Sequence, residues 1–263
     1  PKKLLYLLLN PFSYKIFINK SKDFIFQKKV KSILKSFNFS NQFKGKIVHT
    51  DHHLSHLESS CFYEHFNDAL HISIDGFGDF ASGCYALVKN NKISIKKKIY
   101  FPHSLGIFYQ ALTQFLGFKN YGDEYKLMGM ASYGNPKFMN CMNEIVHSDN
   151  FFSYKLNLHY FNHHKINIIE QDKTTLQMKY KNLYSKKLIS LLGEERKPND
   201  EITEKHLDIA CSVQKHYENI LFKILNDVQK KYRIKKLALS GGCAMNSAAN
   251  GKIIFNTDFE DVY

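Results

Sequence analysis

Apolar positions repeat at helical spacing in several parts of the chain. The longest predicted helix covers residues 201–232, and its inward stripe is Ile209, Val213, Tyr217, Ile220, Ile224 and Val228. Residues 104–117 follow the same pattern and end at a glycine, the residue type that most often terminates a helix. Further helices are predicted at 1–45, after Asp51, at 124–131 and at 244–254.

Strands are predicted where short apolar segments are bounded by glycine or polar residues. Residues 69–74 and 236–240 are typical of buried strands, and 46–49 is a shorter segment of the same kind. Residues 83–88 and 93–99 are joined by Lys-Asn-Asn-Lys, which has the chemistry of a hairpin turn. Because strands lead through glycine turns into helices, the pattern predicts an α/β domain. In such domains, ligands gather at the carboxyl ends of the strands.

Length and composition exclude several classes of protein. The chain has 263 residues, of which 44% are hydrophobic and 23% charged, so wholesale disorder is excluded. No apolar run approaches the ~20 residues that cross a bilayer, and no membrane partner is expected. The five cysteines are dispersed, without a C-x-x-C pair, which favours a reduced, cytoplasmic setting.

The net charge of +13 comes almost entirely from lysine, because only two of the 37 basic residues are arginines. Nucleic-acid surfaces usually use arginine for bidentate contacts to phosphate and guanine. The composition therefore weighs against a nucleic-acid partner, although the excess positive charge suits anionic small substrates.

The first candidate for chemistry is D-H-H-L-S-H, which begins at Asp51. On a helix, His52 and His56 lie one turn apart on the same face, whereas His53 points about 100° away. Two neutral imidazoles on one face can bind a divalent ion, and Asp75 at the end of the next strand can supply a third ligand. Such a set leaves coordination positions open, as a catalytic metal needs. The alternative is a polar helix in a chain with 13 histidines.

Two glycine-rich turns follow the predicted buried strands. The run I-D-G-F-G-D contains Gly76 and Gly78, whose amides could hold phosphate oxygens, although many ordinary hairpin turns have this sequence. The run L-S-G-G-C-A-M-N places Gly241 and Gly242 before a predicted helix, a pattern that favours phosphate or nucleotide binding. Without a Walker lysine this run is not a P-loop, and Cys243 is interpreted as a packing residue.

The segment G-D-E-Y-K-L-M-G, which begins at Gly122, contains charged residues that packing does not explain. Lys126 could contact a phosphate or a carboxylate there. The alternative is an exposed lysine in a solvated turn.

Taken in order, five motifs resemble those of the NodU/CmcH family of carbamoyltransferases. They are H-H-L-S-H, I-D-G-F-G, F-P-H-S-L-G-I-F-Y, G-D-E-Y-K-L-M-G-M-A-S-Y-G and L-S-G-G-C-A-M-N. The resemblance implies an actin-like, sugar-kinase-like fold (the ASKHA, ribonuclease H-like class). It also implies transfer of a carbamoyl group from carbamoyl phosphate to a hydroxyl, at the expense of ATP and through a carbamoyl-adenylate. The transfer is expected near a bound divalent metal, iron(II).

The resemblance assigns roles to residues of this chain. The metal ligands of the family match His52, His56 and Asp75, and its glycine pair matches Gly241 and Gly242. The same site is expected to use Gly76, Gly78 and Asn246 for the nucleotide or carbamoyl-adenylate, and Lys126 as a catalytic residue. Asp123 departs from the family, which usually has glycine there.

The resemblance also predicts how the chain is organised. Residues 1–45 would be a basic helical segment and 46–263 the actin-like carbamoyltransferase domain, with 147–200 as a loop-rich insertion. The opening strands, a further metal aspartate and a YrdC-like domain are not in the sequence, so the chain is predicted to be the middle of a longer enzyme, incomplete at both ends. Its expected partners are a small-molecule or saccharide acceptor and a YrdC-like domain of the same polypeptide. Two alternatives remain open: a tRNA threonylcarbamoyl-transfer enzyme, and an inactive truncated binding module.

Overall fold

The computed structural model describes residues 48, 50–62, 68–90, 92–148, 150–166, 168–171 and 178–263. The chain divides into two units: Asp51–Asn162 with Ile168–Tyr263, and Pro1–Thr50 with His163–Asn167. All the candidate site residues belong to the first of these units. The predicted helical segment 1–45 lies outside the described residues, as do all but Val48 of the predicted strand 46–49.

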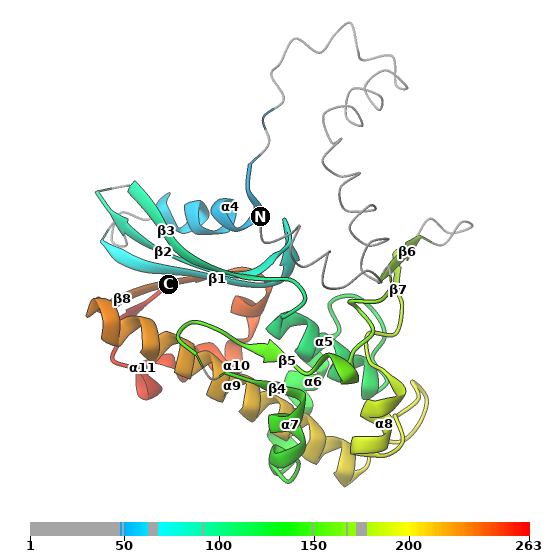
Figure 1. The fold of residues 1–263 in the computed structure, drawn as a ribbon. Helices are drawn as coiled ribbons and strands as arrows, with labels where there is room; N and C mark the ends of the chain where they lie inside the picture. Colours follow the sequence, from blue (N-terminus) through cyan, green and yellow to red (C-terminus); the bar gives the residue numbers. More distant parts are fainter. Residues whose placement is uncertain are drawn as a thin grey trace, which may run out of the picture. The chain divides into compact units, whose positions relative to one another are not determined.

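A five-stranded mixed sheet occupies the larger unit (Figure 1). Its strands are β1 Ala69–Gly78, β2 Ala81–Lys89, β3 Lys92–Tyr100, β8 Lys236–Ser240 and β9 Asp261–Val262, in the order β3-β2-β1-β8-β9. Strands β1 to β3 form an antiparallel meander, whereas β8 is parallel to β1 and β9 is parallel to β8. The predicted α/β class is confirmed. Because β8 pairs in parallel with β1 from Leu70 to Ser73, the turn that follows β8 lies beside the second half of β1.

Helices cover the sheet and connect its strands. They are α4 His52–Ser59, α5 Leu105–Phe115, α6 Glu124–Met130, α7 Met139–Ile145, α8 Lys186–Leu192, α9 Glu204–Tyr232, α10 Ser247–Asn250 and α11 Ile253–Asn256. Single 3₁₀ turns lie at η3 Ser60–Phe62, η5 Ala131–Tyr133, η6 Leu158–Tyr160 and η7 Gly242–Met245. Two small antiparallel sheets pair β4 Val146–His147 with β5 Lys155–Leu156, and β6 Ile169–Gln171 with β7 Met178–Tyr180. No helix in the described part of the chain combines the length and apolar character needed to cross a membrane.

The sheet buries both of its faces. On β2, Cys84 and Ala86 pack against Leu57 of α4, whereas Tyr85 faces the main core and its hydroxyl lies 3.2 Å from that of Tyr232 on α9. Figure 1 shows α4 and α9 on opposite sides of the sheet. This double cover explains why β1 is buried from Ala69 to Ile74, a pattern that marks a central strand.

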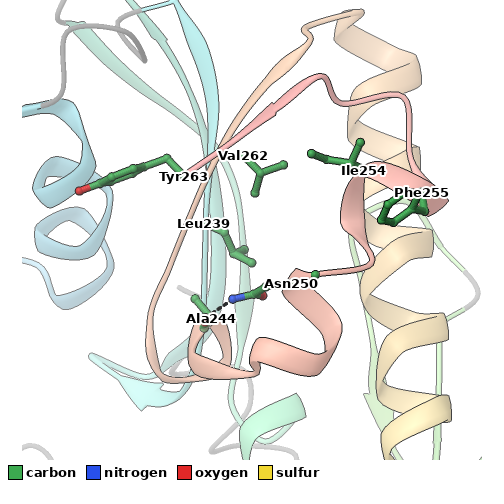
Figure 2. Close-up of a pocket in the computed structure, with 8 residues that line it drawn as sticks. Leu239, Ala244, Asn250, Ile254, Phe255, Val262 and Tyr263 are labelled. Carbon is green, nitrogen blue, oxygen red and sulfur yellow. Dashed lines mark hydrogen bonds between the residues drawn. The ribbon is translucent and has the colours of Figure 1, made fainter.

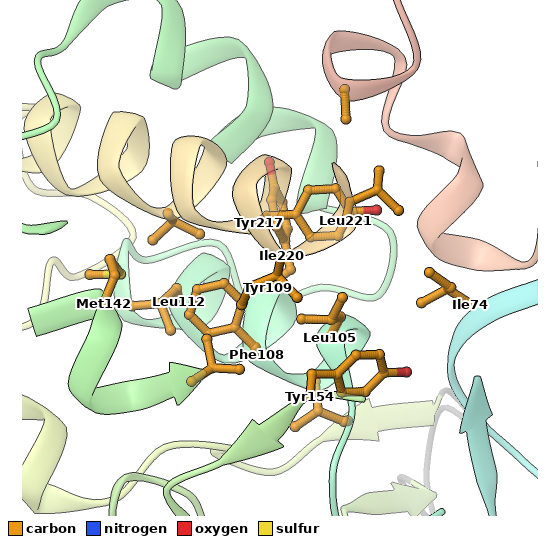
Figure 3. Packing of buried hydrophobic residues seen from close by; sticks show 14 of the residues in the cluster. Ile74, Leu105, Phe108, Tyr109, Leu112, Met142, Tyr154, Tyr217, Ile220 and Leu221 are labelled. Atoms are coloured by element: carbon orange, nitrogen blue, oxygen red, sulfur yellow. The ribbon is translucent and has the colours of Figure 1, made fainter. Parts of the chain in front are cut away.

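The long helix α9 presents the inward stripe that the sequence predicts. All six stripe residues are at most 4% exposed. Figure 3 shows Tyr217, Ile220 and Leu221 of α9 beside Phe108 and Tyr109 of α5 in the main core. The helix begins three residues later than predicted, because the Thr203 side chain and the His206 ring form a capping box at its start.

Two details of the sequence prediction are wrong. Residues 244–254 do not form one helix, because Asn246 has a non-helical ψ of 86° and its side chain caps the separate helix α10. The turn expected at the D-G-F-G sequence is part of β1 instead. The chain reverses at Asp79 and Phe80, which both have positive φ, 48° and 68°.

Candidate metal centre

The side chains of His52, His56 and Asp75 converge where β1 meets α4. The Nε2 atoms of His52 and His56 lie 2.9 and 3.0 Å from Asp75 Oδ2, and 3.2 Å from each other. Within the described ranges, this is the one group of three His, Cys, Asp or Glu side chains close enough to share a metal ion. The structure therefore brings together the three residues that the sequence singled out as ligands, while their binding of a metal stays a prediction.

Three polar contacts fix the start of α4 and thus the two histidines. Asp51 caps the helix by accepting from the Leu54 amide at 3.0 Å, and its other oxygen lies 2.6 Å from Lys98 Nζ. Burial raises the pKa of Asp51, but the hydrogen bonds from Lys98 and Leu54 outweigh it, so the pKa is lowered. The Asp79 carboxylate accepts from the His52 amide at 2.8 Å. A strained turn at Asp79 therefore anchors the first ligand residue.

His53 does not face the site. Its ring is fully buried, Nδ1 lies 2.9 Å from Ser73 Oγ, and burial lowers the pKa of the ring. The helical angle predicted that His53 would be a poorer partner for the ion, and the structure confirms that it points into the sheet instead.

The carboxylate of Asp75 is held by the next residue of β1, Gly76. Its Oδ1 accepts from the Gly76 amide at 2.7 Å, which leaves Oδ2 for the two imidazoles. Burial raises the pKa of Asp75, but hydrogen bonds from His52, Gly76 and His56 outweigh it and the pKa is lowered. An ionised carboxylate with this orientation is the form that binds cations.

Ser104 connects Asp75 and Gly76 of β1 to the start of α5. Its hydroxyl lies 3.2 and 2.6 Å from the carbonyl oxygens of Asp75 and Gly76, and it also accepts from the Ile107 amide at 3.1 Å. The serine therefore caps α5 while it holds the backbone on which Asp75 stands. The F-P-H-S-L-G-I-F-Y motif contains Ser104, but the sequence suggested no role for this residue.

Close approach restricts Gly78 of β1 and the glycine pair that follows β8. A Cβ on Gly78 would lie 1.9 Å from Cδ2 of the His52 ring, and one on Gly242 would lie 2.8 Å from Asp75 Oδ1. Gly241 has a φ of 92°, and its Cβ would lie 2.4 Å from the Ile74 carbonyl oxygen. The turn after β8 thus lies against the part of β1 that carries Asp75.

The donor set fits a divalent cation. Two ligand atoms that lie ~2.1 Å from an ion and ~90° apart are ~3 Å from each other. The observed separations of 2.9, 3.0 and 3.2 Å match three neighbouring corners of an octahedron. Two imidazoles and one carboxylate in this arrangement are typical of sites that keep open coordination positions.

Lys126 lies in the first turn of α6 and forms an ion pair with Asp123, the residue just before this helix. Its Nζ lies 2.7 Å from Asp123 Oδ1, and this hydrogen bond raises the pKa of Lys126. The second oxygen of Asp123 accepts from the Asn120 amide at 3.0 Å, so the aspartate that replaces the usual glycine closes the loop. The catalytic role predicted for Lys126 stays a prediction.

Glu124, at the start of α6, is a carboxylate that the sequence analysis did not single out. Burial, followed by the charge of Asp123, raises the pKa of Glu124. Its charge in turn raises the pKa of Cys243, as does that of Asp75, after the larger effect of burial. The negative charges of Glu124 and Asp75 therefore both reach the turn that follows β8. The raised pKa keeps the Cys243 thiol protonated, which agrees with its interpretation as a packing residue.

Replacing Glu124 with glutamine is expected to stabilise the protein at neutral pH. The raised pKa means that the unfolded chain loses this proton at a lower pH than the folded chain, so stability falls as the pH rises through that interval. The gain from Glu124→Gln should therefore vanish below about pH 4, where both states are protonated. Urea unfolding at neutral pH and below about pH 4 measures this gain in stability, with the exposed Glu201→Gln as a control. A variant no more stable than the parent at neutral pH would contradict this account.

The Y-G pair after E-Y-K-L-M-G has a packing role. A Cβ on Gly134 would lie 2.1 Å from the Leu207 carbonyl oxygen, so only glycine allows this loop to approach α9. The next residue, Asn135, donates its amide to buried Asp208 at 2.8 Å, and Lys137 lies 2.9 Å from the same carboxylate. This part of the family resemblance reflects the docking of α6 rather than the candidate site.

An apolar pocket of about 430 Å³ lies between β8, β9 and the helices α10 and α11 (Figure 2). It is lined by Leu239, Ala244, Asn250, Gly251, Ile254, Phe255, Val262 and Tyr263. None of the predicted site residues lines it.

Comparison with known proteins places the chain in a family. The model of the carbamoyltransferase N-terminus matches residues 7–263. The chain therefore belongs to the family of carbamoyltransferase N-terminal domains. It is similar to an uncharacterized protein of Synechocystis (32% identity, covering 82% of this chain and 33% of the relative). It is also similar to nodulation protein NolNO of Sinorhizobium fredii, with 31% identity over 83% of this chain and 29% of the relative. Nodulation protein NolO of Bradyrhizobium diazoefficiens is 28% identical over 81% of this chain and 34% of the relative. The chain spans about a third of the length of these relatives.

Proposed function

We propose that the chain is part of an ATP-dependent O-carbamoyltransferase. The enzyme moves a carbamoyl group from carbamoyl phosphate, through a carbamoyl-adenylate, to a hydroxyl of a small-molecule or saccharide acceptor. The observation that carries the proposal is the convergence of His52, His56 and Asp75 beside the Gly241–Gly242 turn, in a chain of the carbamoyltransferase family. Similarity to two nodulation proteins supports the assignment of the chain to this family. The hydroxyl acceptor and a YrdC-like domain of the same polypeptide are part of the proposal.

The strand order supports an actin-like fold for this domain. An antiparallel meander of β1, β2 and β3 continues into parallel β8 and β9 through a segment that contains α5 and α9. This topology brings the turn after β8 beside Ile74 and Asp75 of β1, which is where an adenylate phosphate would meet the metal in the proposed enzyme.

The metal proposed for the site is iron(II), held by His52, His56 and Asp75. The 2-His-1-carboxylate set on neighbouring octahedral corners is the arrangement that non-haem iron(II) prefers. A divalent cation there would supply a Lewis acid and a template for the reacting groups.

The chain's own residues have defined tasks in the transfer step. The acceptor oxygen forms a bond to the carbamoyl carbon while the bond from that carbon to the AMP phosphate oxygen breaks, and the hydroxyl proton leaves to a base. Backbone groups at Gly76, Gly78, Gly241 and Gly242 are proposed to bind the adenylate, together with Asn246. Lys126 would place a positive charge next to the phosphate of the adenylate if its ammonium group left Asp123 and bound the substrate instead.

The proposal is tested with the gene product that contains this chain, supplied with ATP, carbamoyl phosphate, iron(II) and a panel of hydroxyl acceptors. We expect AMP release that depends on both carbamoyl phosphate and an acceptor, with a carbamate product detected by mass spectrometry. Lys126→Ala is expected to lower the rate, with Lys119→Ala as a control for the loss of one positive charge. Turnover only with tRNA would favour the threonylcarbamoyl alternative, and no turnover with any acceptor would favour an inactive binding module.

A further inference from the structure

A pair of side-chain amides, one buried and one partly buried, connects α9 to the turn after β8. Gln214 Nε2 donates to Asn246 Oδ1 at 3.0 Å, and Asn246 Nδ2 donates to Gln214 Oε1 at 3.0 Å. Gln214 is 5% exposed, so water does not compete strongly for these two bonds. The residue that the sequence predicted to bind the nucleotide is thus held through its side chain by the protein itself.

Gln214 is fixed from two further directions. Its Oε1 also accepts from the Tyr109 hydroxyl at 2.7 Å, and its Nε2 also donates to Glu218 Oε1 at 2.8 Å. Glu218 is 1% exposed and pairs with Lys252 Nζ at 2.7 Å. A fully satisfied buried network of this kind specifies one arrangement of its members. The orientation of the Gln214 amide is therefore determined by neighbours on α5 and α9.

The partner of Gln214 is the last residue of the segment 241–246, which we call the glycine turn. Asn246 Oδ1 also accepts from the Ala249 amide at 3.0 Å, so the same oxygen caps α10. At the other end of the turn, a Cβ on Gly242 would lie 2.8 Å from Asp75 Oδ1. A second anchor is the Tyr217 hydroxyl, which donates to the Cys243 carbonyl at 2.9 Å. The glycine turn is therefore attached to α9 on one side and lies against Asp75 on the other.

We propose that Gln214 is a positioning residue for the metal centre, acting through Asn246 to hold the glycine turn against Asp75. The inference deepens the proposed function, because it assumes that Asp75 binds a cation. Gln214 itself contacts neither the histidines nor Asp75 in any hydrogen bond of the described residues. Its effect on the metal is expected to pass through the position of the glycine turn, as for other outer partners of metal ligands.

The test compares Gln214→Met with Gln229→Met in the gene product that contains this chain. Both glutamines lie on α9 and are 5% exposed, so the two substitutions remove the same buried amide from the same helix. Hydrogen–deuterium exchange of peptides covering residues 240–250, in the absence of metal and substrate, reports the glycine turn directly. Titration with iron(II) under anaerobic conditions reports the metal centre.

We expect Gln214→Met to speed exchange in the glycine turn roughly tenfold, since both hydrogen bonds between Gln214 and Asn246 are lost. We also expect iron(II) affinity to fall by at most about tenfold, the low end of the loss on removing a direct partner of a ligand, because Gln214 acts on Asp75 only through the glycine turn. Gln229→Met should change neither quantity. If Gln214→Met does not fold, Gln214→Asn replaces it, because it keeps a neutral amide on α9 but shortens the side chain by one methylene, which withdraws the amide from Asn246.

The two measurements separate this inference from the proposed function. If the parent binds no iron(II), the metal assignment fails, and exchange in the glycine turn alone decides whether Gln214 positions it. Unchanged exchange in both Gln214 variants, or equal effects of Gln214→Met and Gln229→Met, would overturn the inference.

Discussion

Asp75→Ala is expected to abolish specific binding of iron(II) by this protein. Asp75 supplies the oxygen that faces both imidazoles, at 2.9 and 3.0 Å, and no other carboxylate of the described residues joins His52 and His56 in a possible ligand group. Loss of a direct ligand should cost at least the ~10–100-fold that is typical for outer partners. The expected result is a fall of more than about 100-fold in affinity, measured by anaerobic titration and by the metal content of the purified protein.

A matched variant separates the ligand role from the general loss of a negative charge. Asp258 is exposed on the loop before β9 and takes part in none of the contacts around the candidate centre, so Asp258→Ala should bind iron(II) like the parent. Circular dichroism would confirm that Asp75→Ala is folded. Retention of parental affinity in folded Asp75→Ala would show that the convergence of the three side chains is an ordinary polar cluster.

Local sequence rules were sufficient to single out the three side chains that converge, His52, His56 and Asp75. The spacing of His52 and His56 and the exclusion of His53 depend on helix geometry alone, and Asp75 follows from the end of a buried strand. The fold class could be predicted in the same way, because the apolar pattern of β1, β8 and α9 is strong. The actin-like assignment came from the family resemblance and not from periodicity, and it stays a proposal.

The residues that the sequence did not reveal act through long-range pairing. Asp79 and Ser104 are near the ligands only because β2 pairs with β1 and α5 begins against the Gly76 carbonyl. Gln214 lies 32 positions before its partner Asn246, and nothing in the periodicity of α9 distinguishes it from other polar residues. Asn246 also shows why the predicted helix 244–254 failed, since its side chain competes with the helix for backbone amides.

Short amphipathic segments were missed for a related reason. The helices α7 and α8 have seven residues each, too few for a periodic pattern to stand out from the loops around them. Their burial depends on the core that α5 and α9 provide, so tertiary packing rather than local propensity determines them. Neither helix contributes a residue to the candidate centre, and the site could be predicted without them.

Gly78→Ala is expected to weaken iron(II) binding by ~10–100-fold while leaving the protein folded, the effect typical of displacing a ligand's support. The added Cβ would lie 1.9 Å from Cδ2 and 2.5 Å from Nε2 of His52, so the ring has to leave its position. Because the obstacle is a side chain and not the backbone, rotation of the imidazole relieves the clash at little cost in stability.

Gly76→Ala is the matched control for metal binding, since a Cβ two residues earlier in the same strand meets no atom within 4 Å. Anaerobic titration of both variants and the parent should give parental affinity for Gly76→Ala and reduced affinity for Gly78→Ala. Thermal unfolding without metal should place the two variants close together, because neither change disturbs the core. Equal affinity of Gly78→Ala and the parent would mean that the position of the His52 ring does not matter for the ion. In that case His56 and Asp75 would have to bind it with a partner other than His52.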